Sequence, residues 1–187
     1  MSDGVKASVR YRTANEGIAI LRDTIIFALR LYTMDKRKEG RYSRIYEQLK
    51  GLLIKTSNPE ARMATICAVL HHKMDDFFWT GFYCLTEGQL IVRTYQGPVA
   101  CQVLAKDTGV CWAAINQGKT MIVPDVEKFP GHIACDSRSK SEIVVPLCDK
   151  NKKIVGVLDV DSDKYETFDE MDALWLGKIV DLIYERS

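Results

Sequence analysis

The chain has 187 residues, of which 47% are hydrophobic and 27% are charged. A chain of this size buries one substantial core and rarely two. Its 26 Lys and Arg residues nearly balance 25 Asp and Glu residues, so the net charge of +1 gives no general attraction to nucleic acid or to an anionic membrane. We therefore expect the partner to be a small molecule or another protein.

We expect neither a secretory signal nor a membrane-spanning helix in the N-terminal segment. Residues 1–12 hold four charged side chains and no uninterrupted apolar run, which argues against a secretory signal. The apolar stretch 18–32 contains Arg22, Asp23 and Arg30, each costly inside a bilayer. We expect a cytoplasmic protein. Its six cysteines then indicate reduced thiols, metal ligation or redox chemistry rather than a structural disulfide framework.

The first third of the chain predicts helices. Apolar residues at helical spacing between 18 and 29 indicate a helix that docks on the domain or on a second copy, which would give a homodimer. The charged run 35–40 is the nearest thing to a linker, so we expect an N-terminal helical extension, residues 1–40, and one domain, residues 41–187. Two amphipathic helices follow, over 42–53 and, after the start signal Ser57-Asn58-Pro59-Glu60, over 63–70.

From Phe77 the pattern changes to short β-rich runs. We expect strands over 78–85, 90–95, 99–104, 120–123, 142–147 and 153–160, with Glu87-Gly88 joining the first two as a hairpin. A short helix is expected over 110–117, and a long one from Thr167, whose spacing to Glu170 matches a capping box, through Ile183. This order predicts an α+β domain with a mostly antiparallel central sheet flanked by N- and C-terminal helices.

The six cysteines divide by their local backbone. Those in regular elements are interpreted as small buried residues or idle thiols: Cys67, Cys84 and Cys148. The other three lie a few residues after a glycine or proline, in irregular backbone where functional side chains are common: Cys101, Cys111 and Cys135. Position alone leaves a structural role open for them. A zinc site using His132, Cys135 and two further cysteines is the competing chemical interpretation, although the usual C-x-x-C pairs are absent.

Charged residues cluster after Cys135. Arg138 and Lys140 would favour an ionised thiol nearby, which a nucleophilic cysteine requires. Glu142 and the Asp159-x-Asp161 pair supply carboxylates, and strand alternation puts both aspartates on one face. Like charges held close raise at least one pKa, which can provide a general acid near neutral pH. The alternative is a solvated strand end with ordinary acids.

Several strings together resemble one enzyme family. They are Trp79-Thr80-Gly81-Phe82-Tyr83, Gln96-Gly97-Pro98-Val99-Ala100-Cys101, Thr108-Gly109-Val110-Cys111, Gly131-His132-Ile133-Ala134-Cys135-Asp136, Ser141-Glu142-Ile143-Val144 and Gly156-Val157-Leu158-Asp159-Val160-Asp161-Ser162. Over residues 42–183 the chain is similar to the free methionine-R-sulfoxide reductases, which are single GAF-domain enzymes. It departs from them at Trp112, where the family usually has a small residue, and in the first forty residues, which have no counterpart.

The resemblance implies a role for each matched residue. Cys135 would be the nucleophile, Cys101 the resolving cysteine and Cys111 an auxiliary thiol. The acids that bind the substrate ammonium and protonate the sulfoxide would be Glu142, Asp159 and Asp161. The aromatic wall around the substrate methyl group would be Trp79 and Tyr83.

The implied reaction needs no metal or organic cofactor. Thiolate attack on free methionine-R-sulfoxide would leave Cys135 as a sulfenic acid, which Cys101 converts to a disulfide for a thioredoxin-like protein to reduce. Two rivals remain: a non-catalytic GAF module that binds a cyclic nucleotide or senses redox state, and a zinc-stabilised interaction domain.

Overall fold

The computed structural model describes residues 35–132 and 135–185. Its contacts divide the chain into two compact units, residues 1–41 and 42–187. The helix expected between residues 18 and 29 lies outside the described residues, so its docking and the homodimer stay predictions. Within the described ranges, no helix combines the length and the apolar character needed to cross a bilayer.

Residues 35–53 form one helix. The prediction of a linker over 35–40 was therefore wrong. Lys and Glu favour helix, and the ion pair of Lys36 with Glu39 at 3.0 Å joins side chains one turn apart. These effects outweigh the helix penalty of Gly40, which is about 1 kcal/mol. The domain boundary near residue 40 stays a prediction.

The second unit is built on one antiparallel sheet in the order β3-β2-β1-β6-β5-β4. Its strands are β1 Trp79–Thr86, β2 Gln89–Gln96, β3 Val103–Leu104, β4 Met121–Val123, β5 Ser141–Cys148 and β6 Ile154–Ser162. The strand expected over 99–104 is much shorter than predicted. Gly97, with φ +119°, and Pro98 turn the chain out of the sheet before it returns as β3.

Three further helices complete the unit: α2 Pro59–Lys73, α3 Gly109–Gln117 and α4 Glu170–Asp181. The predicted start of α2 is confirmed, because the Asn58 side chain accepts a hydrogen bond from the Ala61 backbone at 3.0 Å. The predicted capping box of α4 was wrong by two residues. Asp169 and Asp172 form it, whereas the Thr167 hydroxyl bonds to the preceding loop.

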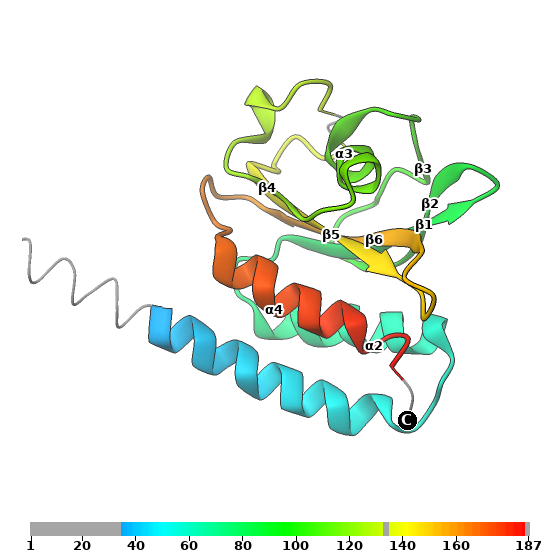
Figure 1. Cartoon of the computed structure of the whole chain (residues 1–187). Helices are drawn as coiled ribbons and strands as arrows, with labels where there is room; N and C mark the ends of the chain where they lie inside the picture. Colours follow the sequence, from blue (N-terminus) through cyan, green and yellow to red (C-terminus); the bar gives the residue numbers. More distant parts are fainter. Residues whose placement is uncertain (1–34, 133–134, 186–187) are drawn as a thin grey trace, which may run out of the picture. The chain divides into compact units, whose positions relative to one another are not determined.

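Helices cover the two faces of the sheet differently (Figure 1). Alternate residues of the central strands, such as Phe82, Ile143 and Leu158, point to the face on which α2 and α4 pack and form one buried cluster with them. The opposite alternation sends Tyr83 and Val157 into a second cluster beneath α3. The α+β class and the mostly antiparallel sheet are confirmed. The face beneath α3 holds the polar side chains discussed below.

We predict that Tyr42→Phe lowers the free energy of unfolding by about 1–3 kcal/mol, since it leaves a buried carboxylate short of a donor. The Tyr42 hydroxyl donates to Asp172 at 2.6 Å, and both side chains are buried. Urea unfolding would measure the change. Tyr46→Phe is the matched control, because Tyr46 packs on the same Trp175 ring but is only partly buried. Equal loss in both variants would contradict the prediction.

Candidate active site

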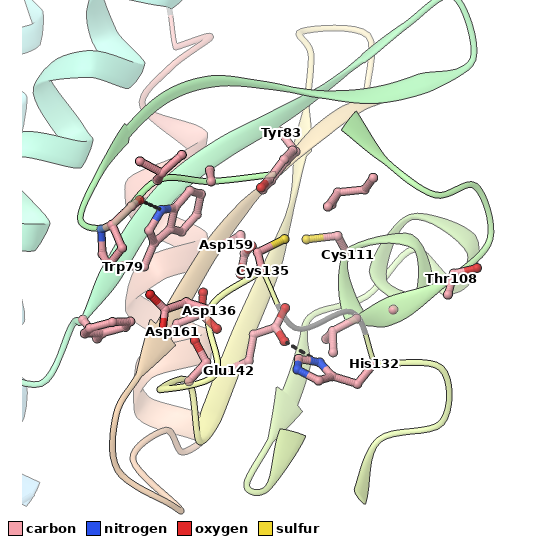
Figure 2. A pocket seen from close by; sticks show the side chains of 18 residues that line it. Trp79, Tyr83, Thr108, Cys111, His132, Cys135, Asp136, Glu142, Asp159 and Asp161 are labelled. Atoms are coloured by element: carbon pink, nitrogen blue, oxygen red, sulfur yellow. Dashed lines mark hydrogen bonds and ion pairs between the residues drawn. The ribbon is translucent and has the colours of Figure 1, made fainter. Parts of the chain in front are cut away.

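A pocket of about 610 Å³ opens on the α3 face of the sheet. It is lined by parts of β1, β5, β6 and α3, by residues 98–100, and by His132, Cys135, Asp136 and Ser139 (Figure 2). Seven of the eight predicted site residues line it: Trp79, Tyr83, Cys111, Cys135, Glu142, Asp159 and Asp161. The eighth, Cys101, is joined to Cys135 by a disulfide. The sequence prediction thus names groups that fold into one place.

Strand register aligns the acids. Asp161 on β6 pairs with Glu142 on β5 and with Trp79 on β1, and Asp159 lies two residues earlier on β6. Since side chains two residues apart on a strand share a face, both aspartates and Glu142 point to the α3 side. Strand alternation thus explains how residues far apart in the sequence form one carboxyl cluster.

The carboxyl groups sit where charge is poorly solvated. Burial raises the pKa of Glu142 well above its usual range, and the nearby Asp159 and Asp161 raise it further. Burial likewise raises the pKa of Asp161. Burial also raises the pKa of Asp159, to about 7, although hydrogen bonds with Cys111 and Glu142 oppose the rise. Burial and mutual repulsion therefore favour protonation within the cluster over full ionisation.

Aromatic rings form one wall of the pocket and hold a loop. The Trp79 ring stacks on Tyr83 and on Tyr95, with centroids 5.8 and 5.5 Å apart. The Trp79 indole donates to the Pro98 carbonyl at 3.1 Å, and the Tyr83 hydroxyl donates to the Cys101 carbonyl at 3.0 Å. The same side chains that line the pocket therefore fix the segment that carries Cys101.

Gly81 makes room for this wall. A Cβ atom at this position would lie 2.3 Å from the Trp79 ring and 2.6 Å from the Tyr95 Cβ. Larger residues would push the indole out of its stack. Glycine is needed at this position because the Trp79 and Tyr95 side chains approach its backbone closely.

Cys101 and Cys135 form a disulfide with Cα atoms 5.6 Å apart. Cys135 is exposed and Cys101 half-buried, so the bond lies at the rim of the pocket. Cys111 is a separate, buried free thiol on α3. The three cysteines that the sequence interpretation set aside do not line this pocket: Cys67, Cys84 and Cys148.

The predicted effect of Arg138 and Lys140 on a thiol needs correction. The Arg138 guanidinium binds the Asp136 carboxylate at 2.7 and 2.9 Å and holds the pKa of Asp136 at about 2. Lys140 pairs with Glu127 at 2.8 Å. Both cations thus face carboxylates. The zinc set of His132 with Cys135 and two more cysteines is not assembled either, because Cys135 is bonded to Cys101.

Sequence reasoning gave several residues of the pocket lining no part in the reductase site, among them Phe78, Ser139 and His132. Phe78 lies under the Arg138 guanidinium, 4.7 Å from it, and Ser139 donates a hydrogen bond to Asp161. His132, named above as a candidate zinc ligand, has its Nδ1 atom 4.0 Å from a Glu142 oxygen. Burial lowers the pKa of His132. All three residues lie within or close to the sequence strings that resemble the enzyme family, and this proximity was the signal in the sequence for their place in the pocket.

We predict that Asp159→Asn lowers the pKa of the Cys111 thiol. Burial raises that pKa well above its usual value, and the Asp159 charge is the next largest cause. Removing the charge favours the thiolate, so iodoacetamide should modify Cys111 at lower pH, as mass spectrometry of the oxidised protein would measure. Asp163→Asn, which removes an exposed charge, is the control. An unchanged pH midpoint in Asp159→Asn would contradict the assignment.

Known proteins share both the sequence and the fold of this unit. The family model of the GAF domain matches residues 56–183. GAF domain-containing protein A of Dictyostelium discoideum is 51% identical over 147 residues, covering 78% of this chain and 92% of that protein. The free methionine-R-sulfoxide reductase of Saccharomyces cerevisiae is 38% identical over 159 residues, covering 81% and 88% respectively.

A solved structure is similar to this chain in both fold and sequence. The X-ray structure of free methionine-R-sulfoxide reductase from Neisseria meningitidis, in complex with its substrate, is similar with a TM-score of 0.75 and 38% identity. The match covers 79% of this chain and 88% of that one. By family model, sequence identity and fold, the chain belongs to the GAF-domain family of free methionine-R-sulfoxide reductases.

Proposed function

We propose that the chain reduces free L-methionine-(R)-sulfoxide to methionine, with Cys135 as nucleophile and Cys101 as resolving cysteine. One observation carries the proposal: a cysteine pair able to form a disulfide and a buried carboxyl cluster border the same pocket. The cysteines supply the two electrons of the reduction, and the acids supply protons and a site for an amino group.

The carboxyl cluster suits a free amino acid. Asp159 is only 7% exposed, and its Oδ1 atom accepts no hydrogen bond within the described part of the chain. A buried oxygen in this state is stabilised by a positively charged donor, and the ammonium of free methionine sulfoxide is one. A peptide-bound residue lacks that ammonium, so this contact favours the free amino acid.

The aromatic wall suits the sulfur end of the substrate. As a sulfoxide oxygen is protonated, positive charge develops on the sulfur, and aromatic faces attract such charge. Trp79 and Tyr83 supply those faces within the pocket. Substrate would thus lie between carboxylates at its amino end and rings at its methyl end.

The proposed first step moves the oxygen to the enzyme. The Cys135 thiolate attacks the sulfoxide sulfur while the neutral carboxyl group of Glu142 or Asp161 protonates the departing oxygen. Burial raises the pKa of both groups, which favours the protonated form that can donate. The protonated oxygen migrates to the Cys135 sulfur as its bond to the substrate sulfur and the transient sulfur–sulfur bond break, so methionine leaves with the electron pair and Cys135 becomes a sulfenic acid.

The second step restores the thiols. The Cys101 thiol attacks the sulfenic acid, water leaves, and the disulfide forms between the same two sulfur atoms that are bonded in this structure. A thioredoxin-like dithiol then reduces the disulfide by exchange, and the exposed side of Cys135 gives it access. A cytoplasmic location would supply such a donor.

A non-catalytic GAF module that binds a cyclic nucleotide is disfavoured by the pocket chemistry. A phosphate beside Glu142, Asp159 and Asp161 would face like charge unless all three carboxyl groups were protonated. Redox sensing without turnover would use the Cys101–Cys135 disulfide, but it would give the buried acids no role, which disfavours this alternative.

We predict that the free R epimer of methionine sulfoxide turns over and the S epimer does not, because one closed pocket must place the ammonium and the sulfoxide oxygen on different acids. Cofactor oxidation in a thioredoxin-recycling system measures the rates. A peptide-bound sulfoxide serves as the second comparison. Equal rates on both epimers would overturn the proposed orientation, and no turnover of the free R epimer would overturn the function.

A single-turnover experiment separates the cysteines. We predict that reduced Cys135→Ser releases no methionine, because the attacking sulfur is lost. Cys101→Ser should release about one equivalent and then stall, since the sulfenic acid forms but is not resolved. Cys111→Ser should fall between these variants and the unmodified chain in recycling. If Cys111→Ser abolishes the first equivalent while Cys135→Ser retains it, Cys111 is the nucleophile and Cys135 the resolving residue.

A further inference from the structure

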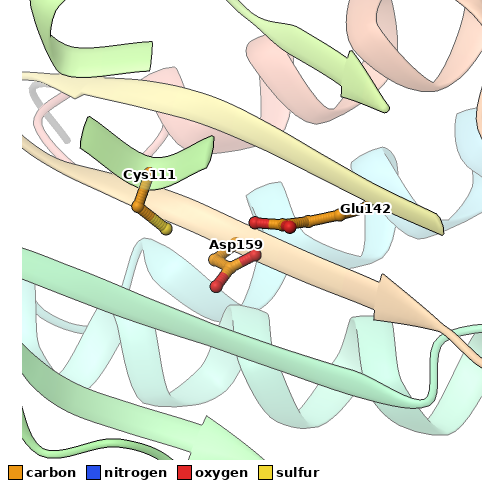
Figure 3. A group of neighbouring side chains, drawn as sticks. All are labelled: Cys111, Glu142 and Asp159. Atoms are coloured by element: carbon orange, nitrogen blue, oxygen red, sulfur yellow. The ribbon is translucent and has the colours of Figure 1, made fainter. Parts of the chain in front are cut away.

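Three potential metal ligands meet inside the pocket. The Cys111 sulfur and carboxylate oxygens of Glu142 and Asp159 all lie within 4.8 Å of one another. Figure 3 shows them converging from α3, β5 and β6. Each residue is less than 10% exposed: Cys111 4%, Glu142 6% and Asp159 7%. The cluster thus differs from the solvated acidic groups common on protein surfaces.

A second observation indicates a cationic ligand at the same place. Asp159 lines the pocket, and its Oδ1 atom is buried and accepts no hydrogen bond from any residue that the structure describes. Buried polar atoms are ordinarily satisfied, and an unsatisfied carboxylate oxygen is costly. A cation bound in the pocket would remove this cost.

We propose that Cys111, Glu142 and Asp159 bind one Zn²⁺ ion, with a fourth position open to the pocket. Zinc binds thiolate sulfur at about 2.3 Å and carboxylate oxygen at about 2.0–2.2 Å, so tetrahedral ligand atoms stand roughly 3.5 Å apart. Side-chain movements of about an ångström bring the present atoms to that spacing. The thiolate selects zinc over magnesium or calcium, which prefer oxygen ligands alone. Binding displaces the thiol and carboxyl protons into solvent.

Zinc bound here would block the reductase reaction. It would take Asp159, the proposed ammonium partner, and Glu142, a proposed proton donor. This consequence rests on the proposed function, whereas binding of the ion does not. The disulfide between Cys101 and Cys135 leaves Cys111 free, so the site is available in the oxidised protein as well.

Calorimetric titration of Zn²⁺ into the full, oxidised chain tests the site, because the disulfide removes Cys101 and Cys135 as ligands. We expect one equivalent to bind at this cluster. Cys111→Ala and Asp159→Asn should each weaken binding by more than about tenfold, the least effect usual for loss of even an indirect partner. Cys148→Ser removes a free thiol outside the pocket and should change nothing. Mg²⁺ should not bind comparably.

Zinc binding that is absent in the unmodified chain, or as tight in Cys111→Ala, would overturn the proposal. If these variants do not fold, as circular dichroism would show, Co²⁺ added to the unmodified oxidised chain gives the second test. A sulfur-to-cobalt charge-transfer band that iodoacetamide modification of Cys111 removes would support the site, and absence of the band would overturn it.

Kinetic measurements distinguish the proposed zinc site from the proposed reductase function. With free methionine-R-sulfoxide as substrate, zinc should raise KM and leave kcat unchanged. Zinc binding without any sulfoxide reduction would contradict the proposed function and leave the metal site standing. Normal reduction without zinc binding would contradict the metal site alone.

Discussion

Glu142, Asp159 and Asp161 lie on neighbouring strands in a register that keeps their carboxyl groups buried side by side. Bringing three acids out of water raises their pKa values, and mutual repulsion makes full ionisation unfavourable. The cluster is therefore stable only if it shares protons or receives a cation. Both the proposed chemistry and the proposed zinc site follow from this constraint.

The rest of the unit maintains this arrangement. Helices α2 and α4 cover the opposite face of the sheet with apolar side chains. This packing holds the strands that carry the acids in place. On the site face, Trp79 and Tyr83 hold the loop that leads to Cys101, and the disulfide ties that loop to Cys135. Apolar packing thus dominates one face, whereas the other combines a smaller apolar cluster with the buried acids.

Much of this organisation could be predicted from the sequence. Alternation placed Asp159 and Asp161 on one face, and the resemblance of several motifs to one family implied that Cys101, Cys111 and Cys135 share one site. Local sequence could not show that the run 35–40 is helical, because its charges suit both a linker and a helix. Nor could it show that Arg138 pairs with Asp136, since the direction of a long side chain depends on tertiary contacts. The position of the His132 ring beside Glu142 depends on the same kind of tertiary contact.

The central claim is that the buried carboxyl cluster recognises the ammonium of a free amino acid. The most direct test compares kcat/KM for free methionine-R-sulfoxide with that for its N-acetylated form, which keeps the sulfoxide and loses the positive charge. A pocket built around a buried charged partner should prefer the free form by at least about a hundredfold. Comparable values for the two compounds would contradict the account.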